Sequence, residues 1–223
     1  MNTLNVPTAA LPATASPLSG LLGPCVRGAL FVALLTGVAY PLATTGVAQL
    51  VWPQQANGSL IERGGAVIGS ALIGQWFEGA AYFQPRPSAT QAPDPQDASK
   101  SLAAPYNAGS SSGSNLGPTN PALIASVQER VAAYRQANGL APDAAVPVDA
   151  VTVSASGLDP HISLANAQLQ AARVARSRGL AVALVEQLVA QNTEGRWLGL
   201  LGEPRVNVLR LNLALDALKA GKE

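Results

Sequence analysis

One uninterrupted apolar segment dominates the first quarter of the chain. Residues 28–61 carry no charge, and the most apolar part runs from Ala29 to Val51. As a helix, residues 28–51 would be about 36 Å long, which exceeds the roughly 30 Å hydrocarbon core of a bilayer. Trp52 follows at the place of an interfacial anchor. The pattern predicts one transmembrane helix over residues 26–52, kinked at Pro41.

Two other interpretations of this segment are a buried core helix and a cleaved signal peptide. Gly46-Val47-Ala48 loosely resembles a cleavage site. However, the apolar stretch is longer than a typical signal-peptide core, and no basic cluster opens the chain. A core helix of this length would also need a polar face. We therefore interpret the segment as a membrane anchor.

The residues before the anchor have no hydrophobic period. They are rich in Pro, Thr, Ala and Ser and carry no charge before Arg27. Such a composition cannot bury enough apolar surface to fold. The sequence therefore predicts a disordered tail at residues 1–25.

Beyond the anchor, short strand-like and helix-like patterns follow one another without regular alternation. The predicted elements are a strand and turn at Gly65–Gln75, a long loop at 84–118, a helix from Pro121 to about Ala137, a strand at Val146–Val153, a helix from Ser163 to Arg178, a helix at 181–191, a strand at Val206–Leu211 and a helix at 212–219. Asn120 and Ser163 are the expected helix caps, and Gly139 and Gly179 the expected helix ends. The fold class is α+β, with one mixed domain over residues 53–223.

The amino-acid composition excludes several classes of function. Hydrophobic residues make up 48% of the chain and charged residues 12%, with a net charge of +1. A nucleic-acid partner is excluded, because there is no excess of positive charge to neutralise phosphates. The single Cys and single His exclude zinc fingers, iron–sulfur clusters and a disulfide within the chain.

The charges that flank the anchor predict its orientation. Arg27 precedes the apolar segment, whereas Glu62 and Arg63 lie ten residues beyond its other end. Counting only Lys and Arg near the ends, the positive-inside rule favours a cytoplasmic N-terminus and an external domain. Cys25 would then lie on the reducing side of the membrane, which agrees with this orientation.

Candidate chemistry is sparse. The pattern Gly109-x-Ser111-x-Gly113 matches a nucleophile elbow, but it lies in a Ser/Gly-rich loop rather than between a strand and a helix. His161 is the only imidazole, and it is expected to be structural, with a partner contact or a catalytic base as alternatives. Residues 173–178 hold three arginines, interpreted as a solvated helix end or as a basic face. The sequence predicts no catalytic, cofactor-binding or metal-binding residues.

Polar turns hold the most specific side chains. They occur at Tyr82–Ala89, Gly113–Pro121, Ser156–Ser163 and Gly202–Asn207. Such turns are either held together by their own side chains or present rigid groups to a partner. The candidate partner contacts are Tyr82, Arg86, Ser88, Asn115, Asn120, Asp159, His161, Glu203, Arg205 and Asn207. We expect reversal of Arg86 or Arg205 to weaken association while leaving the domain folded.

Several sequence blocks, in order, resemble one family. They are Tyr40-Pro41, Gly69-Ser70-x-Leu72-Ile73-Gly74-Gln75-x-Phe77, Tyr82-Phe83-x-x-Arg86-Pro87-Ser88-Ala89, Gly113-Ser114-Asn115-Leu116-Gly117-Pro118-Thr119-Asn120-Pro121, Pro147-x-Asp149-Ala150-Val151-Thr152, Ser156-Gly157-Leu158-Asp159-Pro160-His161-Ile162-Ser163, Gln170-x-x-Arg173-Val174-Ala175, and Gly195-Arg196-x-Leu198-Gly199-x-Leu201-Gly202-Glu203-Pro204-Arg205-Val206-Asn207-Val208-Leu209-x-Leu211-Asn212. Over residues 30–218 the chain resembles the C subunit (KdpC) of the Kdp-type P-type ATPase that imports potassium. Its departures are the Pro/Ala-rich head of 25 residues and Ala155, where Gly is common.

The resemblance implies a role rather than a reaction. It implies a single-pass, non-catalytic accessory subunit of the bacterial inner membrane that stabilises the pump. From the polar turns and the lack of a catalytic pair, we further expect the domain to dock near the outer entrance of the potassium path. The implied partners are a channel-like potassium subunit, the phosphorylated ATPase subunit and membrane lipid. The family is also described as a catalytic chaperone that raises the ATP affinity of the ATPase subunit. ATP is therefore implied for the complex, although this sequence offers no phosphate-binding loop.

Two alternatives belong to other classes. One is an anchored periplasmic hydrolase that uses Ser111 and His161. The other is a periplasmic binding protein, either anchored or released by signal cleavage. Absence of a chemical defect in His161→Ala would exclude the first, and a mature chain in the soluble periplasmic fraction would support the second.

Overall fold

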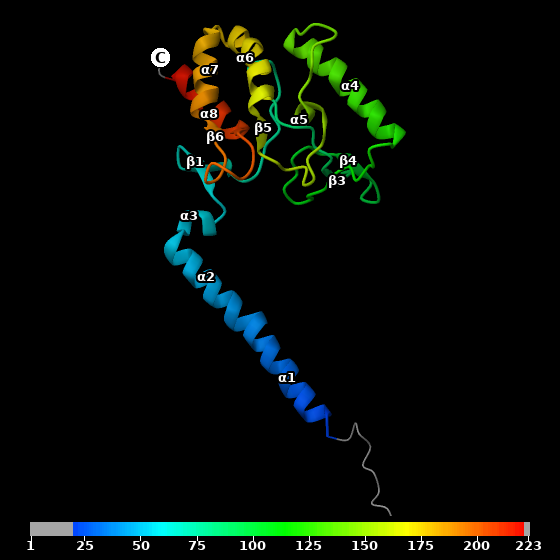
Figure 1. The fold of residues 1–223 in the computed structure, drawn as a ribbon, viewed down its shortest axis with the longest axis vertical. Helices are drawn as coiled ribbons and strands as arrows, with labels where there is room; N and C mark the ends of the chain where they lie inside the picture. Colours follow the sequence, from blue (N-terminus) through cyan, green and yellow to red (C-terminus); the bar gives the residue numbers. More distant parts are fainter. Residues whose placement is uncertain (1–19, 221–223) are drawn as a thin grey trace, which may run out of the picture. The chain divides into compact units, whose positions relative to one another are not determined.

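The computed structural model describes residues 20–220 and divides into two compact units, Met1–Asn57 and Gly58–Glu223. The first unit contains one apolar helix that runs from Leu22 to Val51 and is long enough to cross a membrane (Figure 1). It consists of α1 (Leu22–Leu34), the π-helical turn η1 (Leu35–Ala39) and α2 (Tyr40–Val51), and a short helix α3 (Pro53–Ala56) follows. The helix begins inside the tail expected at residues 1–25. Residues 1–19 of that tail lie outside the described residues.

The π-helical turn lies directly before Pro41, where the sequence predicts a kink. A proline ring has no N–H and collides with the carbonyl four residues earlier in a regular α-helix. The wider turn, in which Tyr40 N donates to Leu35 O, accommodates the ring while the chain stays helical. Nearby, the hydroxyls of Thr36 and Thr44 donate to the carbonyls of Val32 (2.7 Å) and Tyr40 (3.0 Å). All of these polar groups are therefore satisfied within the helix, as a bilayer requires.

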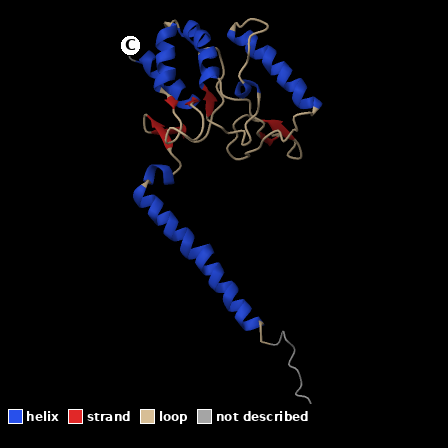
Figure 2. Ribbon diagram, viewed as in Figure 1, coloured by secondary structure: helices blue, strands red, loops and turns tan. Residues whose placement is uncertain are grey.

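The second unit is a mixed α+β domain, as predicted, built from short strands and longer helices (Figure 2). Its strands are β1 (Leu60–Arg63), β2 (Ala66–Ser70), β3 (Gln91–Pro93), β4 (Ser101–Ala103), β5 (His161–Ser163), β6 (Thr193–Glu194) and β7 (Arg205–Asn207). Its helices are α4 (Pro121–Asn138), α5 (Val148–Val151), α6 (Leu164–Arg178), α7 (Val182–Gln191) and α8 (Val208–Ala220). β1–β2 and β3–β4 form two hairpins, and the third sheet has the antiparallel order β5-β7-β6.

The core lies where helices α6, α7 and α8 meet this third sheet. Helix α7 packs against both α6 and α8, while α4 lies beside α5 and α6 (Figure 1). The largest fully buried apolar side chains come from these elements and from the segment before β3: Phe83, Ile162, Val174, Val185, Val189, Val206, Val208, Leu211 and Leu215. Burial of these apolar side chains provides the main driving force for folding the second unit.

Helix caps were predicted well. Asn120 accepts the N–H of Ala122 at 2.9 Å, and α4 ends at Gly139 in the left-handed region. Ser163 accepts the N–H of Asn166 at 3.1 Å, and α6 ends at Gly179 with φ +65°. A glycine adopts this φ without the steric cost that a Cβ would add.

The predicted strand at Val146–Val153 is wrong. The chain forms α5 there, because the carboxylate of Asp149 accepts both the N–H and the hydroxyl of Ser163, each at 2.8 Å. These bonds join segments 14 residues apart and fix a helical turn despite the β propensity of the valines. The long loop predicted at 84–118 also contains structure, since β3 and β4 pair within it.

The predicted strand at Val206–Leu211 is too long. Only Arg205–Asn207 is strand, and α8 begins at Val208. Asn207 marks the change: its amide donates to Ala71 O at 2.9 Å, and its side-chain oxygen accepts the N–H of Arg210 at 3.1 Å. Asn207 therefore ends the strand and caps the helix.

Candidate functional site

Five charged side chains and the imidazole of His161 form a continuous row of close polar contacts along sheet β5-β7-β6 and the segments next to it. This ionic row consists of Arg86, Asp159, His161, Glu194, Arg205 and Arg210. It begins where Nη1 of Arg86 lies 3.0 Å from Oδ2 of Asp159. Four of its members, Arg86, Asp159, His161 and Arg205, are candidate contacts predicted from the sequence.

His161 joins the two halves of the row. Its Nδ1 lies 3.3 Å from Oδ1 of Asp159, and its Nε2 lies 3.6 Å from Oε2 of Glu194. Glu194 in turn faces Arg205 Nε at 3.0 Å and Arg210 Nη1 at 3.5 Å. The sheet register explains this arrangement, because Glu194 pairs directly with Arg205 across β6 and β7.

The turn before β5 sets the position and charge of Asp159. Its Oδ1 accepts the N–H of His161 at 3.0 Å, an Asx-type turn around Pro160. Burial by itself raises the pKa of Asp159, but hydrogen bonds from His161 and Arg86 outweigh burial and lower this pKa below its usual value. Asp159 is therefore ionised at neutral pH, and its charge is neutralised inside the protein.

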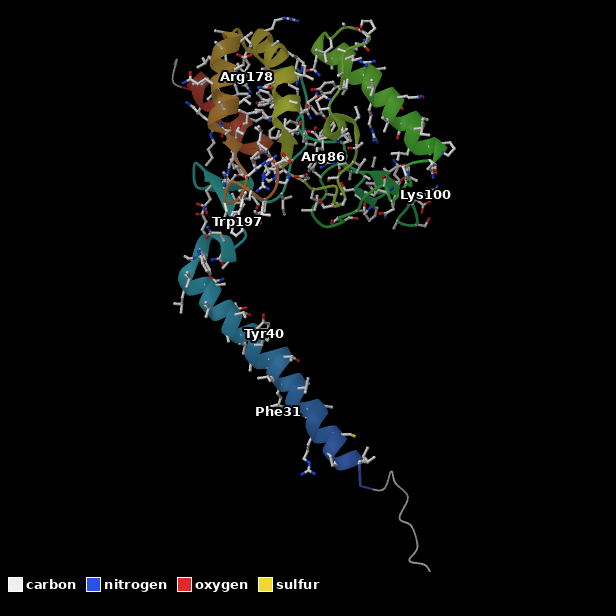
Figure 3. The ribbon with its side chains drawn as sticks, viewed as in Figure 1. Phe31, Tyr40, Arg86, Lys100, Arg178 and Trp197 are labelled. Atoms are coloured by element: carbon white, nitrogen blue, oxygen red, sulfur yellow. The ribbon has the colours of Figure 1, made fainter. Side chains whose placement is uncertain are left out.

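The guanidinium of Arg86, which is labelled in Figure 3, makes several polar contacts within its own domain. Besides Asp159, its guanidinium approaches the carbonyls of Thr152 (3.5 Å) and Val153 (3.4 Å). Within the described part of the chain, its Nε and the Ser154 hydroxyl are buried polar atoms without a hydrogen-bond partner. Both residues line an open groove of about 600 Å³ that Asp159 also borders.

Ser88 lies in a cluster of hydrogen bonds inside the domain. Its hydroxyl donates to Gly157 O at 2.8 Å and accepts the N–H of Tyr106 at 3.1 Å. The Tyr106 hydroxyl donates to Arg86 O at 2.9 Å, and burial raises its pKa. Gly157 has φ +68°, and a Cβ there would lie 2.5 Å from Ser112 O. The hydrogen bonds around Ser88 therefore help to hold these loops together.

Tyr82 stacks against a cation from α6. The guanidinium of Arg178 lies 4.7 Å from the ring centroid and pairs with Asp216 at 2.9 Å. These three residues line a groove of about 300 Å³. Arg173, on the same helix, is buried and donates to Ala80 O at 2.7 Å. The interpretation of residues 173–178 as a solvated helix end is therefore wrong for Arg173 and for Arg178, whose side chain is only 9% exposed.

The remaining predicted contacts differ in exposure. Asn115 is exposed in the left-handed region with φ +50°, and Asn120 caps α4. Glu203 is 79% exposed and pairs with Arg196 at 2.8 Å. Asn207, by contrast, is buried. The structure thus leaves Asn115, Glu203 and Arg205 as the most accessible members of the predicted set.

Two members of the ionic row, Glu194 and Arg210, are not among the contacts that the sequence predicts. Their sequence signal was weak, because neither belongs to a turn motif and the strand β6 is only two residues long. The sequence signal for this contact is the pair of opposite charges at Glu194 and Arg205, which flank a glycine-rich loop. Such flanking charges face each other when the loop closes a hairpin.

The arrangement offers little for nucleophilic or metal chemistry. The Ser111 hydroxyl donates to Ser156 O at 3.0 Å, whereas both ring nitrogens of His161 face carboxylates. The alternative hypothesis of a hydrolase that uses these two residues thus gains no support. Among residues 20–220, no group of three His, Cys, Asp or Glu side chains is placed to hold a metal ion.

Comparison with known proteins gives one consistent result. The family described as KdpC, the c chain of K⁺-transporting ATPase, matches residues 22–217. The chain is 58% identical to a potassium-transporting ATPase KdpC subunit of Bradyrhizobium diazoefficiens, over 88% of this chain and 96% of that protein. Proteins of the same name from Rhodopseudomonas palustris and Mycobacterium tuberculosis are 59% and 55% identical, over 88% and 87% of this chain and 97% of each relative. The similarity covers the apolar helix and nearly all of the second unit.

Proposed function

The chain belongs to the KdpC family, and from this membership we propose that it is a non-catalytic accessory subunit of an ATP-driven potassium import complex. The observation that carries the proposal is the family match over residues 22–217, which includes both the apolar helix and the α+β domain. In this role the chain stabilises the assembled pump. Transport and ATP hydrolysis belong to its partners.

A non-catalytic role is supported by how the domain uses its polar groups. In the ionic row each Asp, Glu and Arg side chain faces an opposite charge of the same domain, and Ser111 bonds to a backbone carbonyl. A catalytic base or nucleophile instead needs a free reactive atom within reach of substrate. The side chains therefore fit a domain that binds partner subunits through its surface and carries out no reaction itself.

We assign the chain to the bacterial inner membrane as a single-pass protein with a cytoplasmic N-terminus and an external domain. The supporting observations are the 30-residue apolar helix and Arg27 at its first end. Lys and Arg near a span favour the cytoplasmic side. The domain then lies on the side from which potassium enters.

The proposed partners are the channel-like potassium subunit, the phosphorylated ATPase subunit and membrane lipid. In this assignment the domain faces away from cytoplasmic ATP. A chaperone effect that raises the ATP affinity of the ATPase subunit would therefore travel through contacts of the membrane helices. ATP is a ligand of the complex in this proposal, and no residue of this chain is assigned to it.

We propose that Arg205, a candidate partner contact whose side chain is 54% exposed, belongs to the docking surface, by which we mean the face of the domain that binds a partner subunit. Arg205→Glu should lower the yield of complex several-fold when a tagged chain is purified with its partners in mild detergent. Lys100→Glu, at a side chain that is 71% exposed, is the matched charge reversal and should leave the yield unchanged. Circular dichroism of each variant chain checks that both remain folded.

One result would contradict the role of Arg205, and another would contradict the assignment of the chain as a pump subunit. Equal yields for both variants would remove Arg205 from the docking surface but leave the subunit assignment intact. Failure of the unmodified chain to purify with a P-type ATPase would overturn the assignment itself. A mature chain found in the soluble periplasmic fraction would instead favour a released binding protein.

A further inference from the structure

Four large apolar side chains are exposed at the end of the hairpin loop between β6 and β7. Trp197, Leu198, Leu200 and Leu201 are 67%, 75%, 80% and 60% exposed, respectively. We call residues 197–201 the apolar tip; Trp197 is labelled in Figure 3. Apolar side chains that gather at one place on a surface mark contacts with a protein or a membrane.

The backbone of the apolar tip is a defined turn. Trp197 N donates to Leu201 O at 2.8 Å, and Leu200 N donates to Trp197 O at 3.1 Å. Leu198 and Gly199 both have positive φ, +51° and +73°. Positive φ at both central residues is typical of the tight turns that close hairpins. A positive φ is uncommon for leucine and is adopted more readily by a polar residue such as Asn. The turn therefore keeps a large apolar side chain exposed in a backbone conformation that leucine seldom adopts.

The charges next to the tip are neutralised in pairs. Arg196 pairs with Glu203 at 2.8 Å, and Glu194 pairs with Arg205 at 3.0 Å. Between Arg196 and Glu203 the sequence carries no charge. The hairpin therefore has a neutral base and an apolar end, so it can approach a medium of low dielectric constant without leaving an unpaired charge there.

We propose that the apolar tip inserts into the interfacial layer of the membrane that the chain's own anchor spans. The second unit begins at Gly58, seven residues after the anchor helix ends at Val51, so insertion of that helix holds the domain at a bilayer surface. Tryptophan and leucine suit this layer, since the indole places its ring at the headgroups while its N–H stays hydrated. The proposal rests on membrane insertion of residues 22–51 and goes beyond the docking role proposed for Arg205.

The composition of the tip favours lipid over a protein partner. Binding sites between proteins usually combine a buried aromatic or arginine anchor with polar groups that fix orientation. From Trp197 to Leu201 the only side-chain polar group is the indole N–H. A bilayer interface demands no such specific partners, because it binds apolar area without a fixed geometry.

Fluorescence of a single tryptophan tests this proposal in the full chain. The chain has three tryptophans, so the double variant Trp52→Phe, Trp76→Phe leaves Trp197 as the only one. This chain is reconstituted into vesicles of phosphatidylethanolamine and phosphatidylglycerol, with or without lipid brominated near the headgroup end of the acyl chains. We expect brominated lipid to quench Trp197 at least twofold, and aqueous iodide to quench it weakly.

Two further variants in the same background serve as a matched pair. Leu200→Asp places a charge at the tip and should reduce the lipid quenching of Trp197 several-fold. Leu102→Asp places the same charge on β4, at a leucine that is 50% exposed, and should leave the quenching unchanged. Circular dichroism confirms that both chains fold.

Either of two outcomes would overturn the proposal. Strong quenching of Trp197 by iodide with none by brominated lipid would place the tip in water. Shielding of Trp197 from both quenchers in the purified potassium-transporting complex, in the same lipids, would show that a partner subunit covers it. Lipid quenching that persists in the complex supports insertion into the membrane.

Discussion

Arg86 and Arg205 carry the same charge at the two ends of the ionic row, but their surroundings differ. The side chain of Arg86 is 22% exposed and bonds to Asp159 and two carbonyls, whereas that of Arg205 is 54% exposed and pairs with Glu194. We therefore keep the sequence-based expectation that charge reversal leaves the domain folded for Arg205 but not for Arg86. Its charge is used inside the domain.

We predict that Arg86→Glu destabilises the domain by about 2 kcal/mol, because it sets two carboxylates against each other in a half-buried place. Arg205→Glu should cost less than about 1 kcal/mol, as expected for an exposed pair. Urea unfolding of the full chain in detergent, followed by circular dichroism, measures both. Equal losses for the two variants would show that Arg86 is no more structural than Arg205.

Asp159 gives the ionic row a pH dependence with a definite sign. Its pKa in the folded chain is lower than the 3.8 usual for aspartate, so its stabilising effect is complete above about pH 4 and is lost as the pH falls through the folded value. Asp159→Asn should therefore be less stable than the unmodified chain at pH 6, with a smaller difference at pH 3. A difference that does not change between these pH values would mean that the carboxylate contributes no ionic stabilisation.

Among the helices and strands, the apolar helix at Leu22–Val51 meets the clearest physical requirement, which is the length and hydropathy needed to cross a membrane. Its described residues pack against no core, and Leu35, in the π-helical turn near its middle, is 51% exposed. Leu35→Arg should reduce membrane insertion, because a central arginine costs about 2.5–3.5 kcal/mol on insertion scales. Leu35→Val should insert normally. Carbonate extraction of membranes measures the inserted fraction, and equal insertion of both variants would show that this position does not face lipid.

The other elements differ in how far local sequence decides them. Helices α4 and α6 begin at their predicted caps and end at glycines, because these signals act within a few residues. The helix α5 and the change from β7 to α8 depend on Asp149 and Asn207, whose partners lie 14 and 136 residues away. Contacts at such separations override β propensity and leave no local pattern to read.

At the scale of the whole molecule, the orientation of the chain decides which partners each unit can meet. Protease added to intact spheroplasts should degrade the domain after residue 58, because Arg27 favours a cytoplasmic N-terminus. The N-terminal end should be cut only after lysis. Protection of the domain in intact spheroplasts would reverse the topology and place it on the side of ATP.

Sequence alone was enough to predict the long apolar helix, the α+β class, the main helix caps and the family. Each depends on composition, on short-range spacing or on motifs that keep their order along the chain. The folded structure was needed to show that Ser88 and Asn207 form hydrogen bonds inside the domain and that Arg173 is buried. It was also needed to place Glu194 in the ionic row. It also left Trp197 and its leucine neighbours exposed. The physical reason is that burial and ion pairing depend on which distant segments meet, and a polar turn looks the same in sequence whether it faces solvent or the core.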